Sequence, residues 1–405
     1  MGHAKPFPRY QSVCGAILLL ITLILGYRFG IAWFLNPDAR IPQDWHVYWA
    51  AAERLIAGEN IYQPQDALPF KYSPTFAYFF RYSFFLLPEK MAAALWMLLS
   101  VFSFFGALAY ASSTLLPFVK NPRRYCYFLI VAIILAWKGV LETLSFGQID
   151  LFILAAYLVI GGSAWSPHHA KSGHRALRIC LWVAILTAKP HFLFVWGITL
   201  FISPIVEAMM LAVAVLASYA LPILWLGPAS LNLQFRQWWN CLVEQQDASF
   251  MITNFNQSLS ATMGRLAERA DLVKHLGLGL LAAFGLFLLW LFSRLPRRAL
   301  IAGIASQRAR LLWWGFGLSS FLVFSPLSWR WLIAGWPPLV AIAAGETRLR
   351  YLAPWMLFTL FTQSALVGPL GFLKIDGPSY YGLFCFGSLA LWAIFAGLLA
   401  QKRPT

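Results

Sequence analysis

Long apolar segments recur along almost the whole of this 405-residue chain, and they restrict the folds open to it. A run of about 20 apolar residues is long enough to cross a bilayer as a helix. Hydrophobic residues make up 60% of the chain and charged residues only 11%, too few to cover a water-soluble fold of this size. The sequence therefore predicts an all-α integral membrane protein with about 10–12 transmembrane helices. The apolar runs lie at residues 13–35, 89–116, 125–142, 148–165, 176–188, 190–203, 204–226, 272–292, 311–325, 330–345, 351–367 and 379–400.

Positive charge is concentrated in the short connections between these runs. The chain has 31 Lys and Arg against 15 Asp and Glu, which in a soluble protein would suggest a nucleic-acid partner. Here the basic connections 120–124, 168–178 and 293–310 alternate with apolar runs, as cytoplasmic loops do in membrane proteins. We therefore expect no nucleic-acid partner, an inner or cell membrane location, and both termini in the cytoplasm. Lys189-Pro190 leaves two alternatives open, since it separates either two short spans or the halves of one broken helix.

The chain is predicted to form a single multi-pass membrane domain, 1–405, with an uncleaved first span and two long loops outside the cytoplasm. The loops cover residues 36–88 and 227–271, and the first contains a third of all the acidic residues. Residues 45–57 have the apolar spacing of an amphipathic helix. Residues 74–87 are apolar but too short to span, which favours an interfacial or re-entrant helix.

No motif of a soluble enzyme is present. The sequence has no P-loop, GxGxxG, GxSxG or HExxH pattern, and no Asp-x-Asp pair of the kind that holds a metal–nucleotide sugar. The five Cys form no CxxC pair, so neither a zinc site nor a disulfide framework is indicated. We expect no metal site and no cofactor. Any chemistry must come from polar residues near or within the membrane, where they are costly to bury and mark functional sites.

Two polar clusters lie in the first long loop. Asp44 and Tyr48 stand among aromatic residues directly after the first span, where a carboxylate with a raised pKa could serve as a general base. The alternative is that Asp44 caps the following helix. Tyr62, Lys71 and Tyr72 lie in a Pro-containing stretch that could offer a cation to a phosphate. The alternative there is an aromatic belt with a snorkelling Lys.

Two more clusters lie at the junctions of later spans. Gln148 and Asp150 belong to a polar stretch that could bind sugar hydroxyls, or that could simply cap a helix. Lys189 lies where Pro190 breaks a helix, and an ammonium group beside freed backbone groups suits an anionic ligand. The alternative is a Lys that snorkels from a short span.

The last two clusters follow in the second half of the chain. Asn256 and Gln257 could orient a ligand, and Arg265 could bind phosphate with two parallel hydrogen bonds, although an ordinary polar loop would look the same. Trp329 and Arg330 could bind phosphate or stack on a ring, or could form an interfacial anchor. Under the topology above, all six clusters fall on or near the outer face, which indicates one outward-facing site.

These short motifs, taken in order, resemble glycosyltransferase family 87, which belongs to the C-type, polyprenyl-phosphate-sugar-dependent glycosyltransferases. The resemblance extends over about residues 40–345. It rests on Asp44-x3-Tyr48, Gly58-x-Asn60-Ile-Tyr62, Lys71-Tyr72-Ser73-Pro74, Leu87-Pro88, Gly147-Gln148-Ile149-Asp150, Lys189-Pro190, Asn256-Gln257-Ser258 with Arg265, and Ser325-Pro326-x-Ser328-Trp329. One departure is that Arg330 follows Trp329 where the family pattern often has His.

The resemblance implies a C-type bundle with amphipathic helices in the first outer loop. It also implies transfer of a hexose, often mannose, from a polyprenyl-phosphate donor to a glycolipid or glycan outside the membrane. Asp44 matches the acidic residue taken as the general base in such enzymes, and a direct displacement would invert the anomeric carbon. The alternative function is a transporter or flippase of a lipid-linked or amphipathic substrate, for which the chain shows no inverted internal repeat.

The resemblance and the chemistry together give each cluster an expected role. The departing lipid phosphate would be stabilised by the cations Lys71, Lys189, Arg265 and Arg330. The sugar and the acceptor would contact Tyr48, Tyr62, Tyr72, Gln148, Asp150, Asn256, Gln257 and Trp329. The expected partners are membrane lipid, the polyprenyl-phosphate sugar donor and the glycan or glycolipid acceptor.

Overall fold

The computed structural model describes residues 9–63, 65–66, 68–165, 172–199, 205–244, 253, 256–269, 271–293, 307–325, 330–347, 352 and 383–401. Every regular element within these ranges is a helix, which confirms the predicted all-α class. In chain order the elements are α1 (Arg9–Leu25), η1 (Gly26–Ala32), α2 (Trp33–Leu35), α3 (Gln43–Ala57), α4 (Pro74–Arg81), η2 (Phe84–Leu86), α5 (Glu89–Leu115), η3 (Leu116–Phe118), α6 (Pro122–Leu135), α7 (Trp137–Phe146), α8 (Asp150–Trp165), α9 (Ser172–Ala188), η4 (Pro190–Phe192), α10 (Leu193–Thr199), α11 (Ile205–Ala220), α12 (Ile223–Glu244), α14 (Leu259–Leu266), α15 (Leu272–Ser293), α17 (Gln307–Phe324), η5 (Arg330–Gly335), α18 (Trp336–Glu346) and α22 (Leu383–Gln401).

Several of these helices are long and apolar enough to cross a membrane. Among the described residues, Tyr10–Leu35 and Glu89–Phe118 meet the length of a full span by themselves. α6 and α7 together would make another, but they meet at an angle of 52°, so the predicted run 125–142 is not one straight helix. Ala136 sits at this break with φ −85° and ψ 1°, outside the helical region. The structure supports a membrane protein, and the number of spans stays a prediction.

Shorter apolar helices account for other predicted runs. They lie at Asp150–Ser163, Ala208–Ala220, His275–Leu291 and Cys385–Ala400. The predicted run 351–367 lies outside the described residues except for Leu352. The break expected at Lys189 is present, because α9 ends at Ala188 and a short 3-10 turn separates it from α10.

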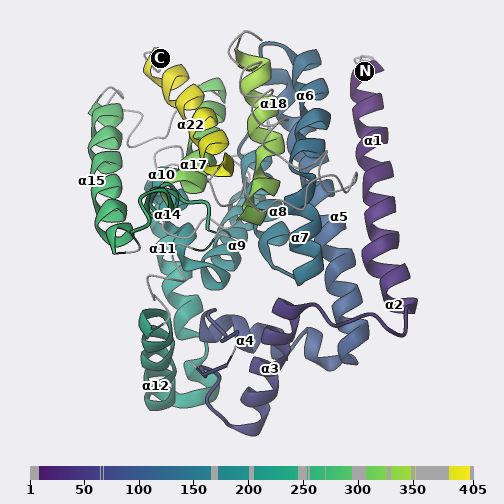
Figure 1. Ribbon diagram of the computed structural model, residues 1–405, viewed down its shortest axis with the longest axis vertical. Coiled ribbons are helices and arrows are strands. Elements are labelled where there is room, and N and C mark those ends of the chain that lie inside the picture. Colours follow the sequence, from purple (N-terminus) through teal and green to yellow (C-terminus); the bar gives the residue numbers. More distant parts are fainter. Residues whose placement is uncertain are drawn as a thin grey trace.

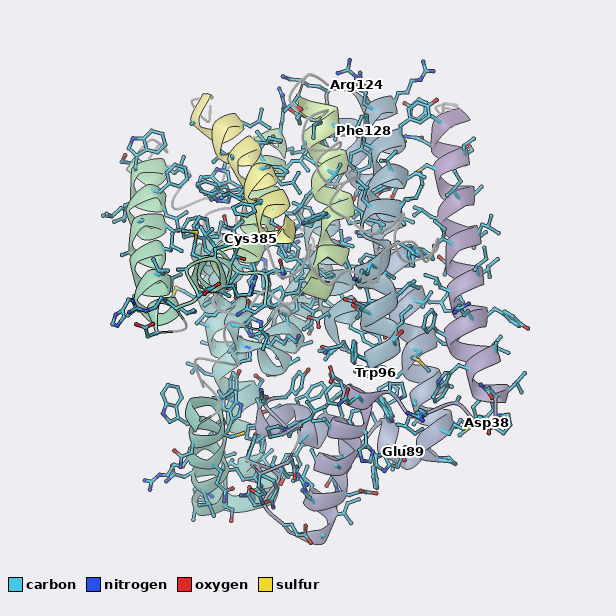
Figure 2. The ribbon with its side chains drawn as sticks, in the orientation of Figure 1. Asp38, Glu89, Trp96, Arg124, Phe128 and Cys385 are labelled. Carbon is cyan, nitrogen blue, oxygen red and sulfur yellow. The ribbon has the colours of Figure 1, made fainter. Side chains whose placement is uncertain are left out.

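The longest helices lie roughly along one axis of the molecule, and α3 and α4 lie across one end of it (Figure 1). α1 begins, and α22 ends, at the opposite end. Figure 2 labels Arg124 at that opposite end, and Asp38 and Glu89 near α3. We call these two ends the α3 end and the Arg124 end. The core between them is built largely by the pairs α5–α8, α6–α18 and α17–α22.

The two helices expected in the first loop are both present. α3 begins at Gln43, two residues before the predicted start. It ends at Ala57 and is followed by Gly58 in the left-handed conformation that glycine adopts readily. α4 begins at Pro74, directly after Ser73, whose hydroxyl caps it by accepting from the Phe76 N–H. Aromatic rings join the two helices, and the Trp45 and Phe80 ring centroids are 4.8 Å apart.

The predicted second loop, 227–271, also contains helix. α12 runs from Ile223 to Glu244 and therefore begins inside the apolar run 204–226. Gly227, with φ 71° and ψ 162°, and Pro228 kink it near its start. Part of the rest of this loop, including residues 245–252, lies outside the described residues.

Candidate active site

Asp44 lies in the first turn of α3, and its carboxylate accepts a hydrogen bond from the side-chain amide of Gln148. The residue at the N-cap is Pro42, and no side chain caps the helix there. The alternative interpretation of Asp44 as a helix cap is therefore wrong. Its carboxylate is turned toward a residue 104 positions further along the chain, which suits a site better than a helix end.

The turn that carries Gln148 is held tightly against α3. Gly147 has φ +70°, and a Cβ atom there would lie 2.9 Å from the Cβ atoms of both Pro42 and Trp45. Its carbonyl accepts a 3.0 Å hydrogen bond from the indole N–H of Trp96 on α5. Only glycine combines this backbone conformation with such a close approach. The amide of Gln148 is thus fixed relative to Asp44 by backbone contacts.

Asp150, two residues further on, forms an ion pair with Lys189. The Lys189 Nζ atom lies 2.7 Å from Oδ1 and 2.8 Å from Oδ2 of Asp150. Asp150 is fully buried and Lys189 is nearly so. The Lys189 ammonium therefore lies inside the protein and does not snorkel to a surface. A buried pair of this kind persists only where both groups find their partners.

The stretch around Lys71 and Tyr72 is tied to α3, to α12 and to the segment that carries Tyr62. The hydroxyls of Tyr48 on α3 and Tyr72 lie 2.9 Å apart, and Tyr62 donates a 2.9 Å hydrogen bond to the Tyr72 carbonyl. The indole of Trp238 on α12 donates to the Lys71 carbonyl at 2.9 Å. The structure therefore brings the predicted residues of the first loop into one cluster.

Ser73 links this stretch to the end of α9. Its hydroxyl donates a hydrogen bond to the carbonyl of Thr187, two residues before Lys189. On the neighbouring helix α4, Thr75 donates to the carbonyl of Ser218 at the end of α11. The helix end that carries Lys189 is consequently fixed beside the segment that carries Lys71.

Burial and the nearby charges shift the ionisation of Asp44. Burial raises the pKa of Asp44 to about 7, Lys189 and Lys71 oppose that rise, and Asp150 adds to it. Burial also lowers the pKa of Lys71, and the charge of Asp44 partly offsets this effect. A carboxyl group with a pKa near neutrality can accept a proton under physiological conditions and is typical of a general base.

Tyr48 and Tyr72 of the cluster are neutral groups. Burial, together with the neighbouring Tyr72 and Asp44, raises the pKa of Tyr48 well above its usual value. Burial and Asp44 have the same effect on the pKa of Tyr72. Both phenols can therefore donate or accept hydrogen bonds but do not act as anions.

Asn256, Gln257 and Arg265 form a second cluster at α14. All three are buried. The Arg265 guanidinium donates to the carbonyls of Thr253 at 2.7 Å and Asn256 at 2.6 Å, and to the Thr262 hydroxyl at 3.1 Å. Arg265 therefore organises its own loop, and its role toward a phosphate stays a prediction.

The remaining predicted site residues lie at the edge of what the structure describes. Trp329 lies outside the described residues, and Arg330 begins η5 with its side chain outside them.

Within the described ranges, no group of three His, Cys, Asp or Glu side chains is placed to hold a metal ion. The expected lack of a metal site and of a cofactor stays a prediction.

Sequence reasoning missed two residues that build the site. Trp96 lies within an apolar run and looks like an ordinary core residue, yet its indole donates to the Gly147 carbonyl and fixes the turn before Gln148. Thr187 contributes only its backbone carbonyl, which no side-chain pattern can indicate. The polar stretch around Gly147 was the one sequence signal that pointed to this turn.

Comparison with known proteins decides the family. The sequence model of glycosyltransferase family 87 matches residues 70–326, which is more than half of the chain. The chain belongs to glycosyltransferase family 87. The predicted resemblance is thus confirmed, and the enzyme class is confirmed at the level of the family. The family 87 match contains Lys71, Gln148 and Lys189 but begins after Asp44, so the assignment of Asp44 rests on geometry.

A curated relative is similar over a shorter stretch. It is described as a polyprenol-phosphate-mannose-dependent alpha-(1-2)-phosphatidylinositol pentamannoside mannosyltransferase from Mycobacterium tuberculosis (strain CDC 1551 / Oshkosh). The identity is 29% over 151 residues, which cover 35% of this family 87 chain and 34% of the relative. The chain thus spans about a third of the length of the relative it matches. No solved structure matches the chain.

Proposed function

We propose that this protein transfers a hexose from a polyprenyl-phosphate donor to a glycolipid or glycan acceptor on the extracytoplasmic face of the membrane, with inversion at the anomeric carbon. The observation that carries the proposal is the buried cluster at the α3 end, where Asp44 lies beside Lys189 and Lys71 in a family 87 chain. The relative that depends on polyprenol-phosphate-mannose supports a lipid-linked donor and makes mannose the first sugar to test.

Asp44 is the general base in this mechanism. The acceptor hydroxyl loses its proton to the Asp44 carboxylate as its oxygen attacks the anomeric carbon, and the bond from that carbon to the phosphate oxygen breaks. The Gln148 amide holds one carboxylate oxygen, which leaves the other to face the acceptor. One base on the face opposite the leaving group is the arrangement of an inverting reaction.

The leaving lipid phosphate carries negative charge, and the cations of the cluster stabilise it. Lys71 is partly buried, so its charge acts in a medium less polar than water. Lys189 approaches from the broken end of α9. Because a phosphate is already a good leaving group, no second carboxylic acid is needed to protonate it. Arg265 and Arg330 remain further candidates for this role, and Asn256, Gln257 and Trp329 for contacts to the sugar.

We assign the acceptor to a cavity that Gln43, the residue before Asp44, helps to line. This cavity of about 490 Å³ lies along the flank of α3 and is lined by Ile41, Gln43, His46, Val47, Ala50, Arg54, Asp66, Leu68 and Phe70. Arg54 and Asp66 form a 2.6 Å ion pair in its wall, and Gln43 precedes Asp44. The sugars next to the reacting hydroxyl would occupy this cavity.

The charges labelled at the two ends support the proposed orientation in the membrane. Arg124 marks one end and Asp38 with Glu89 the other (Figure 2). Basic residues are enriched on the cytoplasmic side of membrane proteins, which supports an orientation with the α3 end outside. Both chain termini then belong to the cytoplasmic side. The active site faces the exterior, where the polyprenyl-phosphate donor and the acceptor meet.

The competing function is a transporter or flippase of a lipid-linked substrate. The helix break at Lys189 favours it, since broken helices form the binding sites of many transporters. Purified protein in nanodiscs, incubated with polyprenyl-phosphate-mannose and a membrane lipid extract, discriminates the two by mass spectrometry. A transferase produces free polyprenyl phosphate and an acceptor heavier by one hexose. Unchanged donor with this and with other lipid-phosphate sugars would overturn the proposal in favour of transport.

A further inference from the structure

The short turn Gly147–Asp150 contacts both the proposed base, Asp44, and the cation Lys189. Gln148 bonds to Asp44 of α3, and Asp150 bonds to Lys189 after α9. The intervening Gly147–Asp150 segment is itself fixed by the Trp96 indole and by close packing against α3. The base and the cation are thus held at a constant separation by residues that need not contact substrate at all.

The Asp150 carboxylate is paired with Lys189 and closed off from solvent. Both of its oxygens lie within 2.8 Å of the Lys189 Nζ atom, and its side chain has no exposed surface. Because the side chain is fully buried, a sugar hydroxyl could reach either oxygen only if the surrounding residues moved apart. The sequence-based role of Asp150 as a sugar ligand therefore fits the geometry less well than a role toward Lys189.

The charged and titratable groups around Asp44 come from four segments. Lys189 follows α9, Asp150 begins α8, Lys71 precedes α4, and Tyr48 lies on α3 itself beside Tyr72. His46 is on α3 as well, but it is exposed and pairs with Glu89 at 3.2 Å. Without Asp150, two cations would act on Asp44 and no anion would balance them.

We propose that Asp150 is a positioning residue, which holds Lys189 in place and balances its charge so that Asp44 stays a competent base until the lipid phosphate enters. The proposal rests on the proposed function and assigns Asp150 a task within it. An unbalanced Lys189 would stabilise the Asp44 anion and weaken it as a base. The incoming phosphate brings its own negative charge, so Lys189 can then serve the leaving group.

The test uses opposite charge changes at the two partners. The pH dependence of kcat/KM reports the ionisation of groups in the free enzyme. Asp150→Asn removes a negative charge near Asp44, so the acid limb of the profile moves to lower pH. Lys189→Gln removes a positive charge and moves the limb to higher pH. Each shift is expected to be about one pH unit, and the double variant is expected to return close to wild type.

A matched control is the exposed pair that His46 of α3 forms with Glu89 of α5. Glu89→Gln removes a carboxylate that pairs with His46, and it is expected to leave the acid limb of the pH profile of kcat/KM unchanged. Asp150→Asn leaves a buried ammonium unpaired, which can prevent folding. In that case the pH profile of Lys189→Gln is compared with that of the double variant. These two proteins differ only at Asp150, so the comparison still measures the effect of the Asp150 charge on Asp44.

A second readout works without turnover. The infrared band of a protonated carboxyl group that is present in wild type and absent in Asp44→Asn can be titrated directly. Its midpoint should fall in Asp150→Asn and rise in Lys189→Gln. Shifted midpoints without any donor consumption would refute the proposed function and support the role of Asp150. Unshifted midpoints in both variants, with a raised KM for the acceptor, would make Asp150 a substrate ligand and overturn this inference.

Discussion

Two ion pairs that each contain a buried carboxylate lie toward opposite ends of this molecule, and they differ in what surrounds them. At the Arg124 end, Glu346 accepts hydrogen bonds from the Arg308 guanidinium, at 2.9 Å to Nε, and from the Lys120 backbone N–H at 3.1 Å. At the α3 end, Asp150 bonds only to Lys189 among the described residues, and a further carboxyl group, Asp44, lies beside the pair.

The comparison distinguishes an ion pair that holds helices together from one that acts on a neighbouring ionisable group. Glu346 joins α17, α18 and the connection before α6, so its oxygens are used in holding helices together. The pair of Asp150 and Lys189 faces a third ionisable group, whose pKa burial raises to about 7. A buried pair alone therefore indicates little about function, whereas a pair that acts on a neutral-range carboxyl group indicates catalysis.

The largest effect is expected for Asp44→Asn. An amide cannot accept the proton of the acceptor hydroxyl, so hexose transfer should fall by about 10²–10⁴-fold. The measurement is product formation by mass spectrometry at saturating donor. Transfer at the wild-type rate would show that Asp44 is not the base. The pair of Asp150 and Lys189 would then differ from the pair of Glu346 and Arg308 in no functional respect.

This variant should not owe its loss of activity to unfolding. Burial raises the pKa of Asp44, so the folded protein binds more protons than the unfolded chain between about pH 4 and 7. The Asp44 carboxyl therefore lowers stability as the pH rises through that window. Asp44→Asn is accordingly expected to be at least as stable as wild type at pH 8, as measured by thermal unfolding in detergent.

The next effect concerns the turn before Gln148. Gly147→Ala would place a Cβ atom against Pro42 and Trp45 in addition to straining a positive φ, and should displace the Gln148 amide from Asp44. We expect kcat to fall about 10–100-fold. Gly58→Ala is the matched control, since Gly58 has the same φ of +70° but no neighbour within 4 Å. Equal losses in the two variants would mean that backbone strain, not the contact with α3, matters.

The pair at the Arg124 end should affect stability alone. Glu346→Gln leaves the Arg308 guanidinium without its anion, and the unfolding free energy should fall by about 2–4 kcal/mol. Activity per folded molecule should be unchanged, because no charge of the α3 end is altered. Thermal unfolding and a rate normalised to folded protein test this together. A shifted pH profile in Glu346→Gln would contradict the separation of the two ends.

The smallest effect is expected in the acceptor cavity. Asp66→Asn weakens the ion pair with Arg54 in the cavity wall while keeping the shape of the side chain. We expect the KM for the acceptor to rise about 3–10-fold with kcat and the donor KM unchanged. An exposed pair, Arg269 with Asp271, offers the control Asp271→Asn, which should change neither constant. A raised donor KM in Asp66→Asn would place the donor, not the acceptor, in this cavity.

Much of the fold and part of the site could be predicted from sequence. Apolar runs and their basic connections indicate a helical membrane protein, and the spacing in residues 45–57 predicts α3 to within two residues. The cluster of Asp44, Lys71, Gln148 and Lys189 could be proposed because these residue types are costly to bury near a membrane. That these residues lie close together could be predicted only by assuming that all six clusters face the same side of the membrane.

The pairing within the cluster could not be predicted. No pattern shows that Asp150 binds Lys189 and that Gln148 binds Asp44, because both contacts depend on how α8, α9 and α3 pack. Trp96 was equally invisible, since a Trp in an apolar run usually contributes only burial. The bend between α6 and α7 occurs at Ala136 without a Pro or Gly, so nothing in the local sequence predicts it.

The most direct test of the account is the pH dependence of kcat/KM for wild-type protein with a lipid-phosphate sugar that it consumes. The account predicts that kcat/KM is constant above pH 8 and falls about tenfold per pH unit below about 7, as Asp44 becomes protonated. The residual activity of Asp44→Asn should lack this limb. A wild-type profile that stays level from pH 8 down to pH 5 would contradict the assignment of Asp44 as the base.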